Sequence, residues 1–126
     1  MNLDYIDKIN GYGDNVVRLY HFDFTQAILF LDVFKETIIN KKKSLDFSKI
    51  RFIQSRNCNL TLRISDEDLG ITTEDDINFF CDMTYEGYEK MIPLLDPFCK
   101  KESKGYQYLY DVDSLTDFLF SPDGTW

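Results

Sequence analysis

The sequence has few of the residues on which catalytic and metal sites are usually built. Its 126 residues include one histidine, His21, and three cysteines, Cys58, Cys81 and Cys99. These cysteine positions fit neither a Cys-x-x-Cys redox pair nor a zinc site, and an odd number of cysteines does not suit a disulfide framework. A lone histidine with no nucleophile motif nearby is typical of a strand surface or a strand end. We therefore expect three free thiols, and no catalytic residue, metal site or cofactor.

Long hydrophobic runs are also missing. No run approaches the roughly 18 apolar residues that a membrane-spanning helix needs. The N-terminal residues lack the basic segment and the apolar segment of a secretory signal. Together with free thiols, this predicts a cytoplasmic protein that does not enter a membrane.

Positive charge is scarce, because 14 Lys and Arg residues face 22 Asp and Glu residues and give a formal net charge of −8. Binding to nucleic acid depends on basic side chains that neutralise phosphates, so nucleic acid is not an expected partner. The charge is uneven: residues 1–65 carry 10 basic and 7 acidic side chains (10 − 7 = +3), and residues 66–126 carry 4 and 15 (4 − 15 = −11). A basic protein is therefore the expected partner of the second half.

What is present predicts one folded domain over residues 1–126. Apolar residues make up 44% of the chain and aromatic residues 16%, which is enough for one hydrophobic core at this length. Asp23 followed by Gln26 predicts the start of a helix through a capping box. The expected buried stripe of that helix follows helical spacing and consists of Ala27, Phe30, Leu31, Phe34 and Ile38. Leu29 and Val33 lie roughly opposite, so a homodimer or partner contact there is an alternative to scattered apolar surface residues.

A run rich in β-forming residues predicts a strand near 16–22. Alternating apolar and polar residues predict a hairpin of two strands, 49–55 and 60–65, around the turn at 56–59. The second half repeats this order, with a strand at 77–82, a helix capped by Thr84 and expected to bend or break at Pro93, and strands at 106–110 and 116–121. The sequence thus predicts an α+β fold from a tandem β-α-β-β pseudo-repeat, with halves at about 16–65 and 77–121 joined by an acidic connector, 65–76. We expect a mostly antiparallel sheet of about six strands, with two helices on one face and the other face open.

The connector is the most acidic stretch of the chain. Six of its twelve residues are carboxylates, namely Asp66, Glu67, Asp68, Glu74, Asp75 and Asp76. It is not an EF-hand loop, because Gly70 stands at the fifth ligand position and Ile71 replaces the required glycine at the sixth. A solvated connector, a looser divalent-cation site and a binding surface for a cationic partner all remain open.

The last quarter combines a tyrosine-rich strand with further carboxylates. Tyr106, Tyr108 and Tyr110 alternate along the predicted strand, and Asp111 and Asp113 follow it. An exposed tyrosine row beside carboxylates suits recognition of Lys and Arg, whereas a row packed under the helices is the alternative.

The strand at 105–110, Gly-Tyr-Gln-Tyr-Leu-Tyr, and the tail at 120–126, Phe-Ser-Pro-Asp-Gly-Thr-Trp, resemble those of small acidic cytosolic immunity proteins of bacterial toxin systems. The resemblance implies a protein that binds and blocks a cognate toxin, often a basic nuclease. It carries over no binding residues.

The resulting hypothesis is a binding protein rather than an enzyme, and an immunity protein in particular. An acidic inhibitor that mimics nucleic acid, or a small-ligand or regulatory module that uses the open sheet face, are the alternatives. The predicted partner-binding residues are Asp66, Glu67, Asp68, Glu74, Asp75, Asp76, Asp111, Asp113, Tyr108 and Tyr110.

Overall fold

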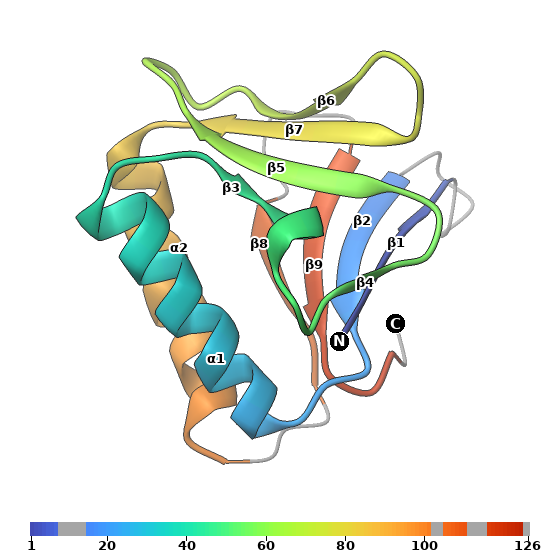
Figure 1. The fold of residues 1–126 in the computed structure, drawn as a ribbon, viewed down its shortest axis with the longest axis vertical. Coiled ribbons are helices and arrows are strands. Elements are labelled where there is room, and N and C mark those ends of the chain that lie inside the picture. The colour runs from blue at the N-terminus through green and yellow to red at the C-terminus, as the bar shows by residue number, and fades with distance from the viewer. Residues whose placement is uncertain (8–14, 102–104, 111–115, 125–126) are drawn as a thin grey trace.

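The computed structural model describes residues 1–7, 15–101, 105–110 and 116–124. In this part of the chain two α-helices pack on a curled, mixed sheet of nine strands, so the fold is α+β (Figure 1). The strands are β1 (Asn2–Ile6), β2 (Asn15–Tyr20), β3 (Leu45–Asp46), β4 (Gln54–Ser55), β5 (Asn59–Ile64), β6 (Gly70–Thr73), β7 (Asn78–Met83), β8 (Gln107–Tyr110) and β9 (Thr116–Ser121). The helical segments are α1 (Phe24–Phe34) with a π-helical continuation (Lys35–Asn40), a 3-10 turn (Phe47–Lys49), and α2 (Tyr85–Leu95) with a 3-10 continuation (Asp96–Cys99).

Both helices begin at the residues that the sequence predicts. The Asp23 carboxylate accepts a hydrogen bond from the Gln26 amide at 2.9 Å, and the Thr84 hydroxyl accepts one from the Gly87 amide at 2.9 Å. All five residues of the predicted stripe of the first helix are buried, which confirms that prediction. Leu29 is 45% exposed, and a second copy of the chain on that face stays a prediction.

Pro93 lies within α2, and the α-helical hydrogen-bonding pattern ends two residues later, at Leu95. The helix is therefore not broken at the proline itself. A bend there stays a prediction. The 3-10 continuation packs beside α1, where Phe98 is buried with its ring 5.1 Å from that of Phe120.

The sheet is not the mostly antiparallel, six-stranded sheet that we predicted. Its strand order is β3-β5-β7-β6-β9-β2-β1-β4, and β8 also pairs with β9. Within the described ranges five pairings are antiparallel, whereas β1/β4, β2/β9 and β5/β7 are parallel. The prediction was wrong because it paired strands that are neighbours in the sequence. In the structure β5 passes over β6 to pair with β7, and β2 pairs with β9 near the other end of the described chain. The prediction also assigned no strand to residues 2–6.

The predicted hairpin of 49–55 with 60–65 does not form. Its first strand is reduced to β4, which pairs with β1 instead of β5. The buried residues of this segment, Phe47, Ile50 and Ile53, recur every third position and not every second, so the chain follows turns here. Phe47 anchors the segment between α1 and the sheet, with its ring 5.6 Å from that of Phe30 and 6.1 Å from that of Phe118.

The acidic stretch at 65–76 is more than a connector, because it contains β6, which pairs with β7 and, at Ile71, with β9. Apart from the two-residue strand β4, the chain therefore contains two units with the same order of strands and α-helices, β1-β2-α1-β3-β5 and β6-β7-α2-β8-β9. Antiparallel pairs recur within each unit, as β1/β2 and β3/β5 in one and β6/β7 and β8/β9 in the other. The two parallel pairs join the units. The last strand of the first unit, β5, pairs with β7 of the second, and the last strand of the second unit, β9, pairs with β2 of the first.

Residues of both units share one hydrophobic core, and both helices lie on the same side of the sheet (Figure 1). Within this core, the rings of Phe34 on α1 and Tyr88 on α2 lie 6.0 Å apart. The hydroxyl of Tyr88 lies 2.7 Å from the carbonyl oxygens of both Arg63 and Cys81, which ties α2 to β5 and β7. Within the described ranges, none of the helices has the length and apolar character needed to cross a membrane.

Candidate functional site

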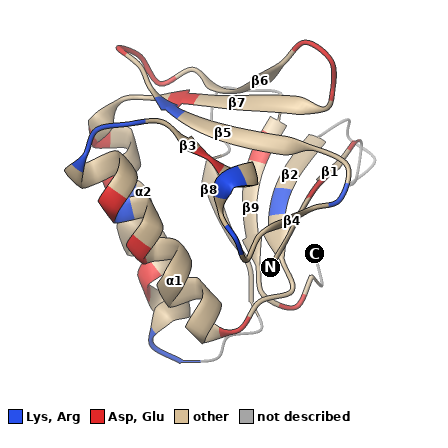
Figure 2. Ribbon diagram, viewed as in Figure 1, with Lys and Arg blue, Asp and Glu red and all other residues tan. Residues whose placement is uncertain are grey.

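The six carboxylates of the acidic stretch lie in two groups, one at each end of β6. Residues 66–68 follow β5, and residues 74–76 form the turn into β7. Figure 2 shows the two acidic segments at opposite ends of the three-stranded part of the sheet that contains β5, β7 and β6. The structure therefore does not bring the predicted residues into one patch.

Asp75 is used inside the β6/β7 turn. Its Oδ1 accepts hydrogen bonds from the amides of Asn78 at 2.8 Å and Ile77 at 3.0 Å, and its Oδ2 accepts one from Asn78 Nδ2 at 3.1 Å. These bonds, led by those from the Asn78 and Ile77 amides, lower the pKa of the Asp75 carboxyl to about 2. The next residue, Asp76, takes a left-handed conformation with φ of 58°. The Asp75 carboxylate thus stabilises the β6/β7 turn.

Asp68 is used at the start of α2. Its Oδ1 accepts from the Thr84 amide at 2.8 Å and from the Thr84 hydroxyl at 2.9 Å. Gly87 allows this approach, because a Cβ at that position would lie 2.7 Å from Asp68 Oδ1. The loop before β6 is thereby fastened to the helix that follows β7.

The other four carboxylates, Asp66, Glu67, Glu74 and Asp76, are exposed. Among the described residues, their side chains form neither ion pairs nor strong hydrogen bonds. They are the acidic groups of this stretch that a partner can reach without disturbing the fold.

The predicted tyrosines do not form a row on one face. The pairing of β8 with β9 shifts between Tyr108 and Tyr110, so strict alternation is lost and Leu109 and Tyr110 are both buried. Tyr108 is half-buried, and Tyr106 is 51% exposed with its ring 6.0 Å from that of Tyr108. A groove of about 520 Å³ between α2 and β8 brings Tyr108 and Tyr110 together with Asp68. The two other predicted residues, Asp111 and Asp113, lie outside the described residues.

A second groove, of about 500 Å³, lies on the outer face of β5, β7 and β6. Its walls include Phe80, Asn78 and Glu74. Arg63 covers the ring of Phe80 at 4.2 Å and is held there by Asp82, with Nε–Oδ1 and Nη2–Oδ2 distances of 2.7 Å each. Sequence reasoning did not name Phe80 as a site residue, although strand alternation already placed it beside Asp82 on the face opposite the core.

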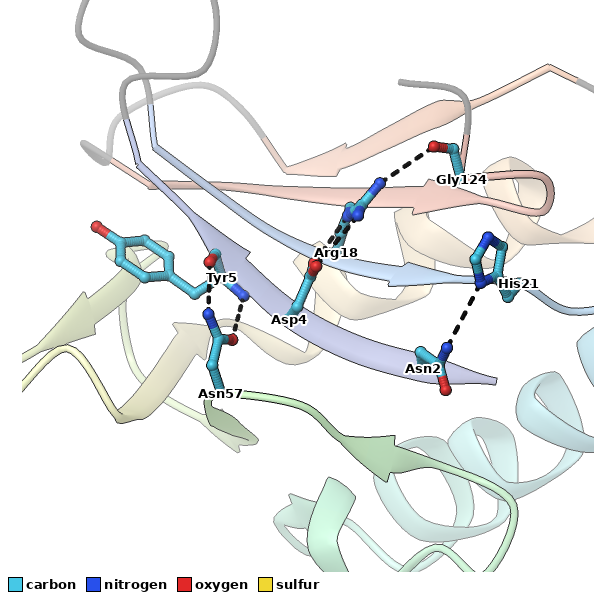
Figure 3. Close-up of polar contacts among 7 residues, drawn as sticks. All are labelled: Asn2, Asp4, Tyr5, Arg18, His21, Asn57 and Gly124. Atoms are coloured by element: carbon cyan, nitrogen blue, oxygen red, sulfur yellow. Dashed lines mark hydrogen bonds and ion pairs between the residues drawn. The ribbon is translucent and has the colours of Figure 1, made fainter.

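Polar side chains of β1 and β2 form a network of contacts that stabilises the fold (Figure 3). Arg18 and Asp4 form a bidentate ion pair at 2.7 and 3.1 Å, and both side chains are only 14% exposed. The guanidinium of Arg18 also covers the Tyr20 ring at 3.9 Å and donates to the Gly124 carbonyl at 3.3 Å. This network joins the N-terminal strands to the chain after β9.

His21 follows β2 and is exposed, as predicted for a strand-end histidine. Its Nδ1 lies 3.5 Å from the side-chain amide of Asn2 (Figure 3). Asn57 holds the neighbouring backbone by pairing with the amide and carbonyl of Tyr5 at 2.8 and 2.9 Å. These contacts hold the N-terminal strand, and among the residues that the structure describes none of them places a nucleophile against the imidazole ring.

The three cysteines are free, as the sequence predicts. Burial raises the pKa of the Cys58 and Cys81 thiols to about 12, so neither is a ready nucleophile. In the described part of the chain, His, Cys, Asp and Glu side chains nowhere gather in a group of three or more that suits a metal ion.

A comparison with known proteins found no matching family model, no matching curated protein and no matching solved structure. The arrangement of residues in this chain is therefore the basis for a functional proposal.

Proposed function

We propose that this protein is a cytoplasmic binding protein that recognises a basic protein surface through the carboxylates at the two ends of β6. The observation that carries the proposal is the exposure of Asp66, Glu67, Glu74 and Asp76 without ion-pair partners among the described residues. Exposed like charges repel one another, and a partner of opposite charge relieves that repulsion and is attracted from a distance.

The strand between the two acidic groups supports this role. β6 is held by β7 along its length and by β9 at Ile71, so the spacing between the groups is set by the sheet. Arg63 already covers the Phe80 ring, but the groove beside it has room for the apolar stem of a partner Lys or Arg whose cationic head would lie close to Glu74. Charge then speeds encounter, and the groove adds contact area.

The resemblance of the last quarter to immunity proteins supplies the class of partner. We propose a cognate toxin domain with a basic surface, which this protein neutralises by covering the functional site of the toxin. Inhibition by a protein of this size requires no catalytic residue on the inhibitor.

The test begins with capture of the partner from native cells on the tagged protein, followed by association kinetics at low and high salt. Glu67→Lys combined with Glu74→Lys should slow association about tenfold or more at low salt and reduce its salt dependence, because rim charges act mainly on the encounter rate. Asp75 and Asp68 are left unchanged, because their carboxylates hold the turn and the helix start.

Glu89→Lys is the control, since Glu89 is exposed on α2 and belongs to neither of the two acidic groups beside β6. It makes half of the same change in net charge, so a comparable slowing by this variant would indicate a general charge effect and contradict a local contact. Unchanged association of the double variant at both salt concentrations would reject the proposal. Equal unfolding midpoints show that the variants are folded.

A further inference from the structure

A third groove lies on the less acidic half of the molecule, between the end of α1 and the segment from Ser44 to Phe52. Its volume is about 570 Å³. Small-molecule sites in proteins typically measure about 300–1,000 Å³ and have mainly apolar walls with a few polar groups. The apolar walls here are the side chains of Val33, Leu45, Ile50 and Phe52.

The charged rim of this groove is mainly basic. Lys49 and Arg51 line it, both are exposed, and within the described ranges neither forms an ion pair. Figure 2 shows this basic segment between β3 and β4. Two free cations beside an apolar groove stand out in a chain with a net charge of −8.

Asp46 is the one carboxylate among the residues that line the groove, and its Oδ1 is already occupied. It accepts from the Ser48 hydroxyl at 2.7 Å, from Asn59 Nδ2 at 2.8 Å and from the Ser48 amide at 2.9 Å. Burial opposes ionisation of this group, but the bonds from Asn59 and Ser48, together with nearby Lys49, lower its pKa. One negative charge thus faces two positive charges, which leaves the rim cationic.

The backbone of the opposite wall is unusual. Residues Lys35–Asn40 form a π-helix, a conformation that is rare in proteins and is found frequently at functional sites. Thr37 lies within it and lines the groove, and Ser44 lies nearby on the same groove. Two hydroxyl groups therefore accompany the two cations around the apolar walls.

From these observations we propose that the groove binds a small amphiphilic anion, an aliphatic or aromatic carboxylate. Its apolar body would lie on Val33, Leu45, Ile50 and Phe52, and its carboxylate would face Lys49 and Arg51. The volume of about 570 Å³ lies within the range of about 300–1,000 Å³ that is typical of small-molecule sites. The site uses none of the carboxylates around β6, so it is independent of the proposed protein partner.

The test is a titration of the full chain with decanoate, below its critical micelle concentration and near neutral pH. Backbone amide chemical shifts monitor the binding. We expect saturable binding, with the largest shifts at Thr37, Ile50 and Phe52. 1-Decanol has the same chain without the charge, and it should bind about tenfold more weakly, since a charge-assisted contact is lost.

Lys49→Gln combined with Arg51→Gln should weaken decanoate binding about tenfold and leave 1-decanol binding unchanged. Arg56→Gln is the matched control, because Arg56 is exposed outside the groove and its loss should not alter either titration. All three positions are on the surface, so the variants should remain folded, which the amide spectrum itself verifies.

Three results would overturn the proposal. They are equal affinity for decanoate and 1-decanol, unchanged decanoate affinity in the double variant, and shifts that do not saturate or that map outside the groove. An equal loss of decanoate affinity in Arg56→Gln would likewise show general charge attraction and reject a built site.

Discussion

At the level of single residues, an exposed carboxylate can either stabilise the fold or be available to bind a partner. Its hydrogen bonds within the protein show which of these roles applies. Glu74 and Asp75 are neighbours in one turn, yet Asp75 accepts bonds from two backbone amides while the Glu74 side chain bonds to no other described residue. Sequence reasoning treated both as binding residues, because composition reports charge and not the direction in which a side chain points. Asp75 is therefore unsuitable as a binding test, since its reversal would disturb the turn with or without a partner.

Asp75 should make stability depend on pH in acid. Its folded-state pKa, about 2, lies below the ordinary value of 3.8, so the unfolded chain takes up the proton first as pH falls. The stabilisation is complete above about pH 4 and is lost between pH 4 and pH 2. We expect Asp75→Asn to lower the urea midpoint near neutral pH and the difference from wild type to shrink through this window. Glu74→Gln loses no such bonds, so its difference in urea midpoint from wild type should not shrink in the same way as pH falls. If the difference for Asp75→Asn stayed constant between pH 4 and pH 2, the stabilising role of the Asp75 carboxylate would be contradicted.

Phe34 is a second residue with a measurable contribution. It is 1% exposed and contacts the rings of Phe30 and Tyr88, so it joins the two helices in the core. We expect Phe34→Ala to reduce the free energy of unfolding by about 3–5 kcal/mol in chemical denaturation. Leu29→Ala on the exposed side of the same helix should cost less than about 1 kcal/mol. Similar losses for the two variants would mean that Phe34 is not a core anchor.

At the scale of elements, the start of α2 depends on contact with a loop far from it in sequence. Alanine in place of a glycine inside an exposed helix usually adds about 0.5–1 kcal/mol of stability. Here a Cβ at Gly87 would lie 2.7 Å from Asp68 Oδ1 and 2.9 Å from Met83 Cε. Alanine would therefore push the Asp68 carboxylate away from Thr84.

A double-mutant cycle tests this arrangement. We expect Gly87→Ala to destabilise the wild-type protein and to be neutral or stabilising in an Asp68→Ala background, with a coupling on the order of 1 kcal/mol. Denaturation midpoints of the four proteins measure it. Additive effects would show that the loop and the helix start do not depend on each other.

The helices and most long strands could be predicted because their signals are local. Asp23 and Thr84 mark helix starts, and the spacing of Ala27, Phe30 and Phe34 marks a buried face within a few turns of chain. The pairing of β5 with β7 has no such signal, since nothing in either strand identifies a parallel partner. The strand predicted at 49–55 was wrong for a related reason. Phe47 packs between α1 and β9, and that contact overrides the strand propensity of the residues that follow.

At the scale of the whole molecule, the exchange of last strands makes each unit incomplete without the other. Six residue pairs join β5 to β7 and six join β2 to β9. A fragment of residues 1–65 therefore lacks the parallel partners of β2 and β5, and a fragment of residues 66–126 lacks the parallel partners of β7 and β9. Each fragment alone exposes strand edges that are paired in the whole protein.

We expect each fragment to be unfolded alone and an equimolar mixture to recover the native fold, because the cut falls in the exposed loop after β5. Amide spectra of the fragments and of their mixture provide the measurement. Substituting Leu19 by Asp in the first fragment should abolish recovery, whereas substituting the exposed Leu29 by Asp should not. A native-like spectrum from either fragment alone would contradict the interdependence.

The same exchange has a consequence for the order of events during synthesis. The edge of β2 that receives β9, with Val17 and Leu19, leaves the ribosome roughly 100 residues before its partners Phe118 and Phe120 do. Protein synthesis proceeds at about 5–20 residues per second, so this edge stays without β9 for roughly 5–20 s. During that time its backbone groups can pair with another chain. We therefore expect the newborn chain to depend most on chaperones in the interval before residues 116–121 emerge, and correct folding to be completed only after β9 has been synthesised.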